Sequence, residues 1–536
     1  MNLSFFKTPS WDIQSVKPPW DTRPSIYQHI LAHIKPGEPG LGEDGEQLPD
    51  EELVRGDSQI GWAAGALDGV FGHHGGGAET AEAAQKILAD LRALNDRSTD
   101  DRAQAIYDHL TEHSALEYID QLLSAVVEDD RLDAERLHSI ARWLAVGAAD
   151  REPIKCAIAL LGVFQGDDDD RDLLLTLGRH EEFTLYATVA LQNAANDSEL
   201  SLWALACLVK GWGRIQIIER LAETKDEQIK AWMLREGYRN DIMYEYTALI
   251  CARTGDLLGN LRRPDPDEKL LKGAGSLLST LIQGRGGPSE GMESYPEGSE
   301  AAELYLKHLR DREPDLEDFV NVSAIEQFLN EDEAHDPALG WPDRRETLLE
   351  LISSIRARPG WETKVREGLG STDRQTFWTA TQAASVLGMD IWETYFQRIK
   401  QGEDYWYFAM QTDEPERIDR VVQLAEKMLP LDEIASGPAE VLGLGPEYQH
   451  HSALDFVLQD LRRFPGKGWP LIRAGLRSPV VRNRNMAVQA LATWGQPQWP
   501  KDAMPLLERA IKEEPEEDTL EMLQKLLAGE SLEFQS

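Results

Sequence analysis

The chain has 536 residues, of which 41% are hydrophobic and 28% are charged, a composition typical of globular proteins rather than of disordered chains. Its 94 acidic and 55 basic side chains give a formal net charge of -39. Such a charge repels nucleic acid phosphates and anionic lipid headgroups, so it argues against both as partners and favours a basic protein. The alternative is that the charge only keeps a long, exposed structure soluble.

The expected location is the cytoplasm. The N-terminal sequence MNLSFFKTPSWD has no apolar core behind a basic start, and no window approaches the roughly 18 consecutive apolar residues of a membrane span. The three cysteines, Cys156, Cys207 and Cys251, lie in apolar helical patterns without CxxC spacing. We expect them to be buried, reduced thiols.

The first part of the chain, residues 1–57, is predicted to hold one helix and an acidic, glycine-rich loop at 35–59. An N-terminal helical repeat arm is expected over 58–283. Within it, apolar residues recur at spacings of three and four in segments separated by short polar turns, which indicates helices in series. The predicted helices cover 101–113, 115–127, 133–148, 153–165, 181–195, 199–210, 214–223, 226–236 and 241–253.

A second glycine-rich loop, 284–298, precedes the predicted C-terminal repeat arm over 299–536. This loop is interpreted either as a hinge between the two arms or as a long turn within one stack, and the turn is favoured. A further acidic connection at 330–343 separates two helical blocks in the second arm.

The clearest repeat unit is 469–494, in which Ser478 and Pro479 separate two amphipathic segments. The serine–proline step breaks the helix because proline disfavours helical geometry in the residue before it. The pattern predicts that Met486 and Leu491 are buried and that Arg482 is partly exposed near the turn.

This unit, LRSPVVRNRNMAVQALATW, resembles a HEAT repeat, in which a Val-Arg pair opens an alanine-rich second helix. Together with the segment 58–76, which contains WAAGALDGVFGHH, it resembles a bacterial family of HEAT-like proteins, some of which carry the label limonene hydroxylase. The resemblance implies a helical repeat fold, and the label implies a terpene oxidation.

The predicted fold class is therefore all-α, an α-solenoid of divergent HEAT-like helix pairs. Each pair buries its apolar stripe against its neighbours, so contacts are expected only between neighbouring units. Strands are not expected, because alternating β-branched stretches bounded by turn dipeptides are scarce.

The most unusual local sequence, 63–79, places Asp68, His73 and His74 before three glycines and a new helix. Such a loop can present backbone N–H groups to an anion, and these side chains can bind a divalent metal or act as acid and base, with Glu290 or Glu293 from the second loop as partners. No Walker or HExxH pattern accompanies it. A flexible polar turn is the favoured interpretation.

Two further patterns are weighed and set aside. His450 and His451 precede a predicted helix at 452–463, and they join the first histidine pair in one metal site only if the stack curls until its ends meet. The acidic run 167–172 fails the calcium-loop pattern, which needs glycine at its sixth position and glutamate at its twelfth. Acids before a helix complement its dipole. We therefore predict no metal site and no cofactor.

Fifteen tryptophans are many for this length, and several cluster with other aromatic residues between 341 and 408. Most are expected to fill helix interfaces. Trp406 and Tyr407, next to Glu403 and Asp404, are the best candidates for exposed anchors, because an acid beside an aromatic ring suits a cationic partner.

Three functions remain open at this point. The first is a binding protein that holds a basic protein partner, with a bacterial immunity or inhibitor protein as one concrete form. The second is an enzyme, of the hydroxylase type that the label implies, with its site in the loop at 68–77. The third is a structural scaffold.

Overall fold

The computed structural model describes residues 11–20, 22–55, 81–194, 197–284, 287, 289–530 and 532. These residues form an all-α structure in which helices are joined by short turns. They contain no strand, and the only strand-like pairing in the described ranges is an isolated bridge between Val441 and Val480. The chain divides into two compact units, Met1–Gly360 and Trp361–Ser536.

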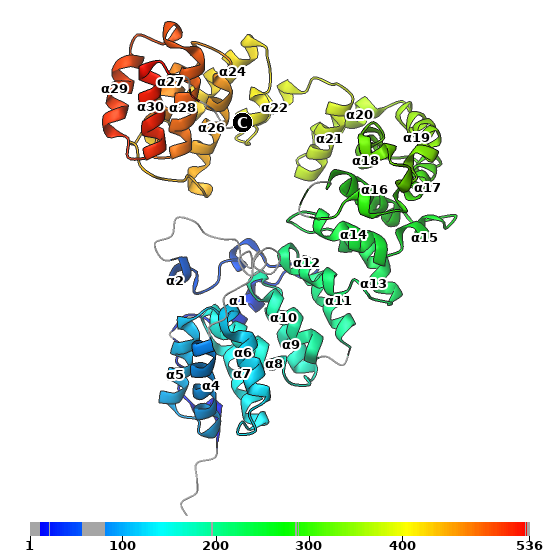
Figure 1. The fold of residues 1–536 in the computed structure, drawn as a ribbon, viewed down its shortest axis with the longest axis vertical. Helices are drawn as coiled ribbons and strands as arrows, with labels where there is room; N and C mark the ends of the chain where they lie inside the picture. The colour runs from blue at the N-terminus through cyan, green and yellow to red at the C-terminus, as the bar shows by residue number, and fades with distance from the viewer. Residues whose placement is uncertain are drawn as a thin grey trace, which may run out of the picture. The chain divides into compact units, whose positions relative to one another are not determined.

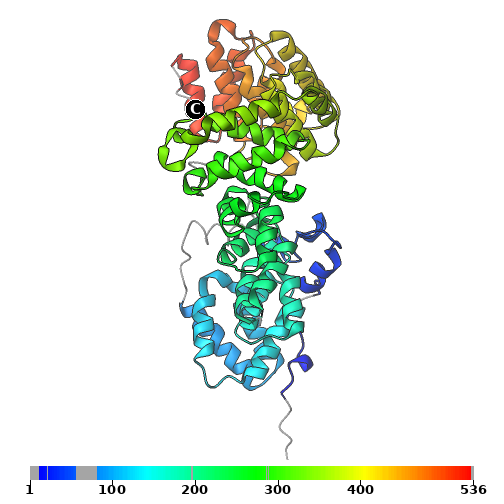
Figure 2. The same ribbon diagram turned by 90° about the vertical axis from the view of Figure 1, so that its right-hand side faces the viewer.

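The helices of the first unit follow one another in chain order (Figures 1 and 2). They are α1 (Ile26–His33), α2 (Glu51–Arg55), α4 (Ala81–Asp96), α5 (Asp100–Glu112), α6 (Ala115–Val127), α7 (Ala134–Gly147), α8 (Arg151–Leu161), α9 (Asp168–Leu177), α10 (Glu181–Ala194), α11 (Ser198–Leu208), α12 (Gly211–Arg220), α13 (Glu227–Trp232), which continues into the π-helical segment η3 (Met233–Gly237), α14 (Glu245–Thr254), α15 (Leu257–Leu261), α16 (Glu268–Gln283), α17 (Gly298–Arg310), α18 (Leu316–Phe328) and α19 (Trp341–Arg356).

These helices pack as an α-solenoid. Successive even-numbered helices contact one another from α4 through α6, α8, α10, α12, α14 and α16 to α18, and the intervening helices pack beside them. Consecutive helices also contact, as α7 and α8 do. Each helix therefore buries its apolar stripe against its neighbours, which is the expected behaviour of a repeat stack.

Aspartate side chains begin many of these helices. The carboxylate of Asp133 accepts a hydrogen bond from Arg136 N at the start of α7, and Asp226 accepts from two backbone N–H groups of α13. At α18, Asp315 and Asp318 form a capping box. Since each cap satisfies backbone donors that the helix leaves free, part of the acidic excess stabilises helix starts.

The described part of the N-terminal segment differs from the prediction. It holds two α-helices, α1 and α2, rather than one, and α1 packs on α7 and α9. Trp20 packs against Trp143 with the two rings tilted and their centroids 4.6 Å apart, and it lies so close to Gly147 that a Cβ there would be 2.3 Å from its ring. Asp50 accepts two hydrogen bonds of 3.1 Å from the Arg151 guanidinium.

The expectation that contacts join only neighbouring repeats was therefore wrong for this segment. It crosses several helix pairs because the partly buried Trp20 and the buried carboxylate of Asp50 contact residues about a hundred positions further along the chain.

The second unit is a smaller helical stack. Its helices are α20 (Trp361–Leu369), α21 (Arg374–Val386), α22 (Trp392–Lys400), α23 (Trp406–Met410), α24 (Pro415–Met428), α25 (Leu431–Ile434), α26 (Gln449–Leu461), α27 (Trp469–Gly475), α28 (Val481–Trp494), α29 (Ala503–Glu513) and α30 (Glu517–Ala528).

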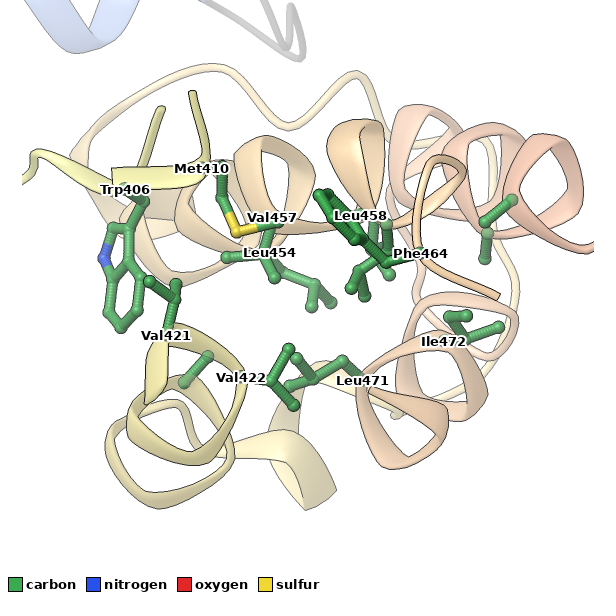
Figure 3. Close-up of a cluster of buried hydrophobic side chains, with 14 of the residues drawn as sticks. Trp406, Met410, Val421, Val422, Leu454, Val457, Leu458, Phe464, Leu471 and Ile472 are labelled. Atoms are coloured by element: carbon green, nitrogen blue, oxygen red, sulfur yellow. The ribbon is translucent and has the colours of Figure 1, made fainter. Parts of the chain in front are cut away.

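The core of this unit runs from α22 to α30, and part of it is drawn in Figure 3. The predicted C-terminal helix pair is confirmed as α27 and α28, which contact each other. Leu491 is fully buried, and the Arg482 side chain is 54% exposed. Met486 is only partly buried, because it lies at the edge of the cluster rather than within it.

Three other expectations change. Cys207 is exposed, because α11 turns this position away from the interface that buries Leu205 and Ala206. The segment predicted as one helix over 241–253 becomes helical only at Glu245, because Asn240 Oδ1 accepts hydrogen bonds from the N–H groups of Ile242 and Met243 and holds a turn. The compact units divide at Gly360 instead of between the two predicted arms at 284–298, and this loop, favoured as a turn within one stack, lies within the first unit.

Candidate binding cleft in the second unit

A cleft of about 860 Å³ opens in the second unit between the start of α21 and the connection from α22 to α23. The wall on the α21 side includes Asp373 and Trp378, and the opposite wall includes Arg398, Asp404 and Phe408. Two of the predicted partner-binding residues, Glu403 and Asp404, lie in this lining.

Aromatic rings from both walls meet in the cleft. Trp378 is 43% exposed and meets the Phe408 ring edge-on at a centroid distance of 5.9 Å. Tyr395 stacks on the other side of Phe408 at 5.1 Å, and Tyr405 lies 6.1 Å from it. These rings pack against one another, and the Trp378 indole stays partly exposed to the cleft.

Arg398 connects the two sides of the cleft. Its guanidinium carbon lies 3.6 Å from the centroid of the Phe377 ring, and its Nη1 donates to Glu403 at 2.8 Å. Its Nη2 donates to the carbonyl of Ser371 at 2.6 Å, in the turn before α21. The residue therefore ties the α22–α23 connection to that turn and neutralises Glu403.

Asp404 differs from the other carboxylates of the cleft. Asp373 caps α21 by accepting from Thr376 N at 2.8 Å, and Glu403 is paired with Arg398. Asp404 forms no hydrogen bond or ion pair with the residues that the structure describes, and partial burial raises the pKa of its carboxyl. Arg374 is exposed and also lines the cleft, but it forms no ion pair with Asp404. The lining of the cleft thus contains one exposed, unpaired carboxylate and, on the α21 side, a partly exposed indole.

The four predicted partner-binding residues are placed differently. Tyr407 is 40% exposed and packs against Phe408 at 5.3 Å, next to the cleft rather than in its lining. Trp406 is only 5% exposed, so the expectation that it is a surface anchor was wrong. Figure 3 shows its indole within the buried cluster, near Val421 of α24, because this face of α23 packs into the core.

The sequence interpretation missed Trp378, Arg398 and Phe408. A signal for Trp378 was present, because Phe377, Ala380 and Ala384 form the buried stripe of α21 and the next position after Phe377 falls outside that stripe. No comparable signal marks Arg398, whose partners lie about 5 to 29 positions away along the chain.

The alternative catalytic residues Asp68, His73 and His74 lie outside the described residues. Glu290 and Glu293 are exposed, and Glu293 accepts a hydrogen bond from the nearby Gly291 N at 2.8 Å.

His451 and Asp167, from the two remaining polar patterns, have structural partners. His451 Nδ1 contacts Ser478 Oγ at 3.1 Å and Asn483 Oδ1 at 3.0 Å, and Asp167 caps α9. Within the described ranges, no group of three histidine, cysteine, aspartate or glutamate side chains is placed to hold a metal ion. None of the described helices is long and apolar enough to cross a membrane.

No protein-family model and no curated protein matches the chain. A solved structure described as "Circular tandem repeat protein with novel repeat topology and enhanced subunit contact surfaces" aligns with 14% sequence identity over 84% of this chain and 93% of its own, at a TM-score of 0.14. The fold assignment rests on the packing of this chain's own helices.

Proposed function

We propose that this protein is an acidic α-solenoid that binds a basic protein partner, and that the cleft beside Asp404 receives a cationic side chain of that partner. The observation that carries the proposal is the unpaired carboxylate of Asp404 in a cleft whose other wall presents the open Trp378 indole. A cation bound there can form an ion pair with the carboxylate and a cation–π contact with the negative face of the ring.

The charge of the whole chain supports the same class of partner. A net charge of -39 creates a field that attracts basic surfaces before contact, although acids used as helix caps serve the fold as well. A bacterial immunity or inhibitor protein that masks a basic toxin in the cytoplasm is one form of this function. In this proposal, α27 and α28 form the helix pair that resembles a HEAT repeat. The extended surfaces of stacked repeats are suited to binding other proteins.

The proposal is tested with labelled basic, neutral and acidic peptides of equal length, whose binding to the full chain is followed by fluorescence anisotropy. Asp404→Asn removes the cleft carboxylate, and Asp432→Asn is the matched control, because Asp432 is an exposed acid on α25 outside the cleft. We expect the basic peptides alone to bind, and Asp404→Asn to weaken them about fivefold.

The control should leave the affinity unchanged. Equal losses in both variants would show that only net charge is sensed and that the cleft is not the binding site. Absence of binding by any basic peptide would overturn the function itself.

A further inference from the structure

We propose that the cleft selects arginine over lysine, with the guanidinium of the partner stacked on Trp378 and paired with Asp404. This inference rests on the proposed function and names the side chain that the site takes. It is carried by a structural pattern that the second unit repeats within itself.

The pattern is an arginine that lies over an aromatic ring while it pairs with a carboxylate. Arg398 lies over Phe377 at 3.6 Å and pairs with Glu403 at 2.8 Å. Arg420 lies over Phe396 at 4.3 Å and pairs with Glu393 at 2.9 Å.

A third example lies on the same helix as Arg420. Arg417 lies over Trp392 at 5.1 Å, and its Nη1 donates to Asp390 at 3.0 Å. The same geometry thus recurs at surfaces formed by α21 to α24, with either a phenylalanine or a tryptophan as the platform. Lysine also occurs over a ring in this unit, as Lys364 does over Trp361 at 5.2 Å.

Trp378 and Asp404 repeat two of the three parts of this pattern. The indole is open and fixed by Phe408, and the carboxylate lines the same cleft. Among the residues that the structure describes, no cation lies over the Trp378 ring or pairs with Asp404, and Arg374 on the rim does neither. The third part, a guanidinium, is therefore assigned to another molecule.

Arginine fits the site better than lysine for a geometric reason. A planar guanidinium can lie flat on an indole and still donate in its own plane to a carboxylate, whereas an ammonium is a compact point charge that is more strongly hydrated. The cleft is partly open to solvent, so the gain from this geometry is modest, about fivefold in affinity.

The experiment uses three peptides that differ at a single position, which is arginine, lysine or citrulline. Citrulline keeps the planar shape and removes the charge. Binding to the full chain is measured for the wild type, Trp378→Leu and Trp378→Ala. Because Trp378 is 43% exposed and lies outside the buried stripe of α21, its replacement should leave the buried core intact. Trp378→Leu retains an apolar side chain without a π face.

We expect the wild type to bind the arginine peptide about fivefold more tightly than the lysine peptide and the citrulline peptide weakest. Both Trp378 variants should bind arginine and lysine equally, and Asp404→Asn should weaken both peptides while Asp432→Asn weakens neither.

Equal affinity of the wild type for arginine and lysine would overturn the inference, and so would a preference that persists in both Trp378 variants. If the basic peptides still bind in an Asp404-dependent way, the proposed function stands while the selectivity fails. If no basic peptide binds, both fail together.

Discussion

The guanidinium of Arg398 lies 3.6 Å from the centre of the Phe377 ring. This contact joins α22, which carries Arg398, to α21, which carries Phe377. The same guanidinium donates to the carbonyls of Leu369 and Ser371 and to the carboxylate of Glu403. A single, mostly buried cation thus holds three separate chain segments in one geometry.

Arg398→Lys should loosen the cleft, because lysine keeps the charge but cannot stack and donate in several directions at once. We expect a loss of about 2 kcal/mol in the free energy of unfolding of the second unit. Hydrogen exchange should accelerate at the turn around Ser371 and at the start of α23. Exchange that rises equally throughout the unit would instead indicate a general loss of stability.

Leu491→Ala tests the helix face of the C-terminal pair. Leu491 is fully buried in the core of the second unit, so its truncation should cost about 2 to 5 kcal/mol in denaturant unfolding. Met486→Ala is the matched comparison, since Met486 is only partly buried in the same helix, and its cost should be clearly smaller. A Leu491→Ala cost below about 0.5 kcal/mol would contradict the packing of α28.

The helix pattern could be predicted from the sequence, because it depends on local spacing and caps. The helix predicted at 115–127 is α6 with the same bounds, and the break at Ser478 and Pro479 separates α27 from α28. The exposure of single aromatic residues could not be predicted as well. Trp406 stands directly between Tyr405 and Tyr407, and a helix of five residues such as α23 leaves the buried face undetermined by periodicity.

The cleft itself depends on contacts between segments. Glu403 and Asp404 are adjacent in the chain with the same charge, yet only Glu403 meets Arg398. The backbone direction after α22 decides which of the two carboxylates reaches Arg398. No local sequence pattern predicts that direction. The docking of Asp50 on Arg151 is a similar case.

His180 predicts acid sensitivity of the first unit. This side chain is buried, and burial lowers its pKa from 6.5 to about 4. Between pH 6.5 and about 4 the unfolded chain binds a proton at His180 and the folded chain does not. The free energy of unfolding is therefore highest above pH 6.5 and falls by about 3 kcal/mol as the pH drops from 6.5 to about 4.

The replacement His180→Gln should remove this part of the pH dependence while it lowers stability at neutral pH, because the contact of Nε2 with the Glu46 carbonyl at 3.3 Å and the bond from Glu182 N to Nδ1 at 3.2 Å are disturbed. Denaturant unfolding of both proteins at a series of pH values measures the difference. An unchanged slope in the variant would show that other groups cause the acid sensitivity.

Asp455 predicts the opposite slope in the second unit. Burial raises the pKa of its carboxyl to about 6, although Asn483 and Arg482 partly offset the effect. Between the unfolded pKa of 3.8 and the folded pKa of about 6, the folded chain binds a proton at Asp455 and the unfolded chain does not. The stabilisation that this proton gives is fully present below pH 3.8 and is lost as the pH rises through 6.

Asp455→Asn should flatten this slope, which amounts to about 3 kcal/mol, because the amide oxygen can still accept from Asn483 Nδ2 without a charge to bury. Unfolding of the variant and of the wild type at two pH values on either side of the window gives the comparison. A variant whose stability changes with pH as the wild type does would contradict the assignment to Asp455.

Salt should separate the two ways in which acidity contributes to binding. The charge of -39 acts at a distance, and such attraction is screened over about 8 Å at physiological ionic strength. Raising the salt concentration should therefore slow the association of a basic peptide much more than it speeds dissociation. In the proposed complex Asp404 contacts the bound cation, so Asp404→Asn should mainly speed dissociation. Asp432→Asn should change neither rate beyond the small effect of one charge in the total. Stopped-flow association and dissociation rates of the same peptide across a salt series distinguish these outcomes.

An association rate that is indifferent to salt would mean that the acidic surface serves solubility alone, and a dissociation rate that is equal in the two variants would remove Asp404 from the interface.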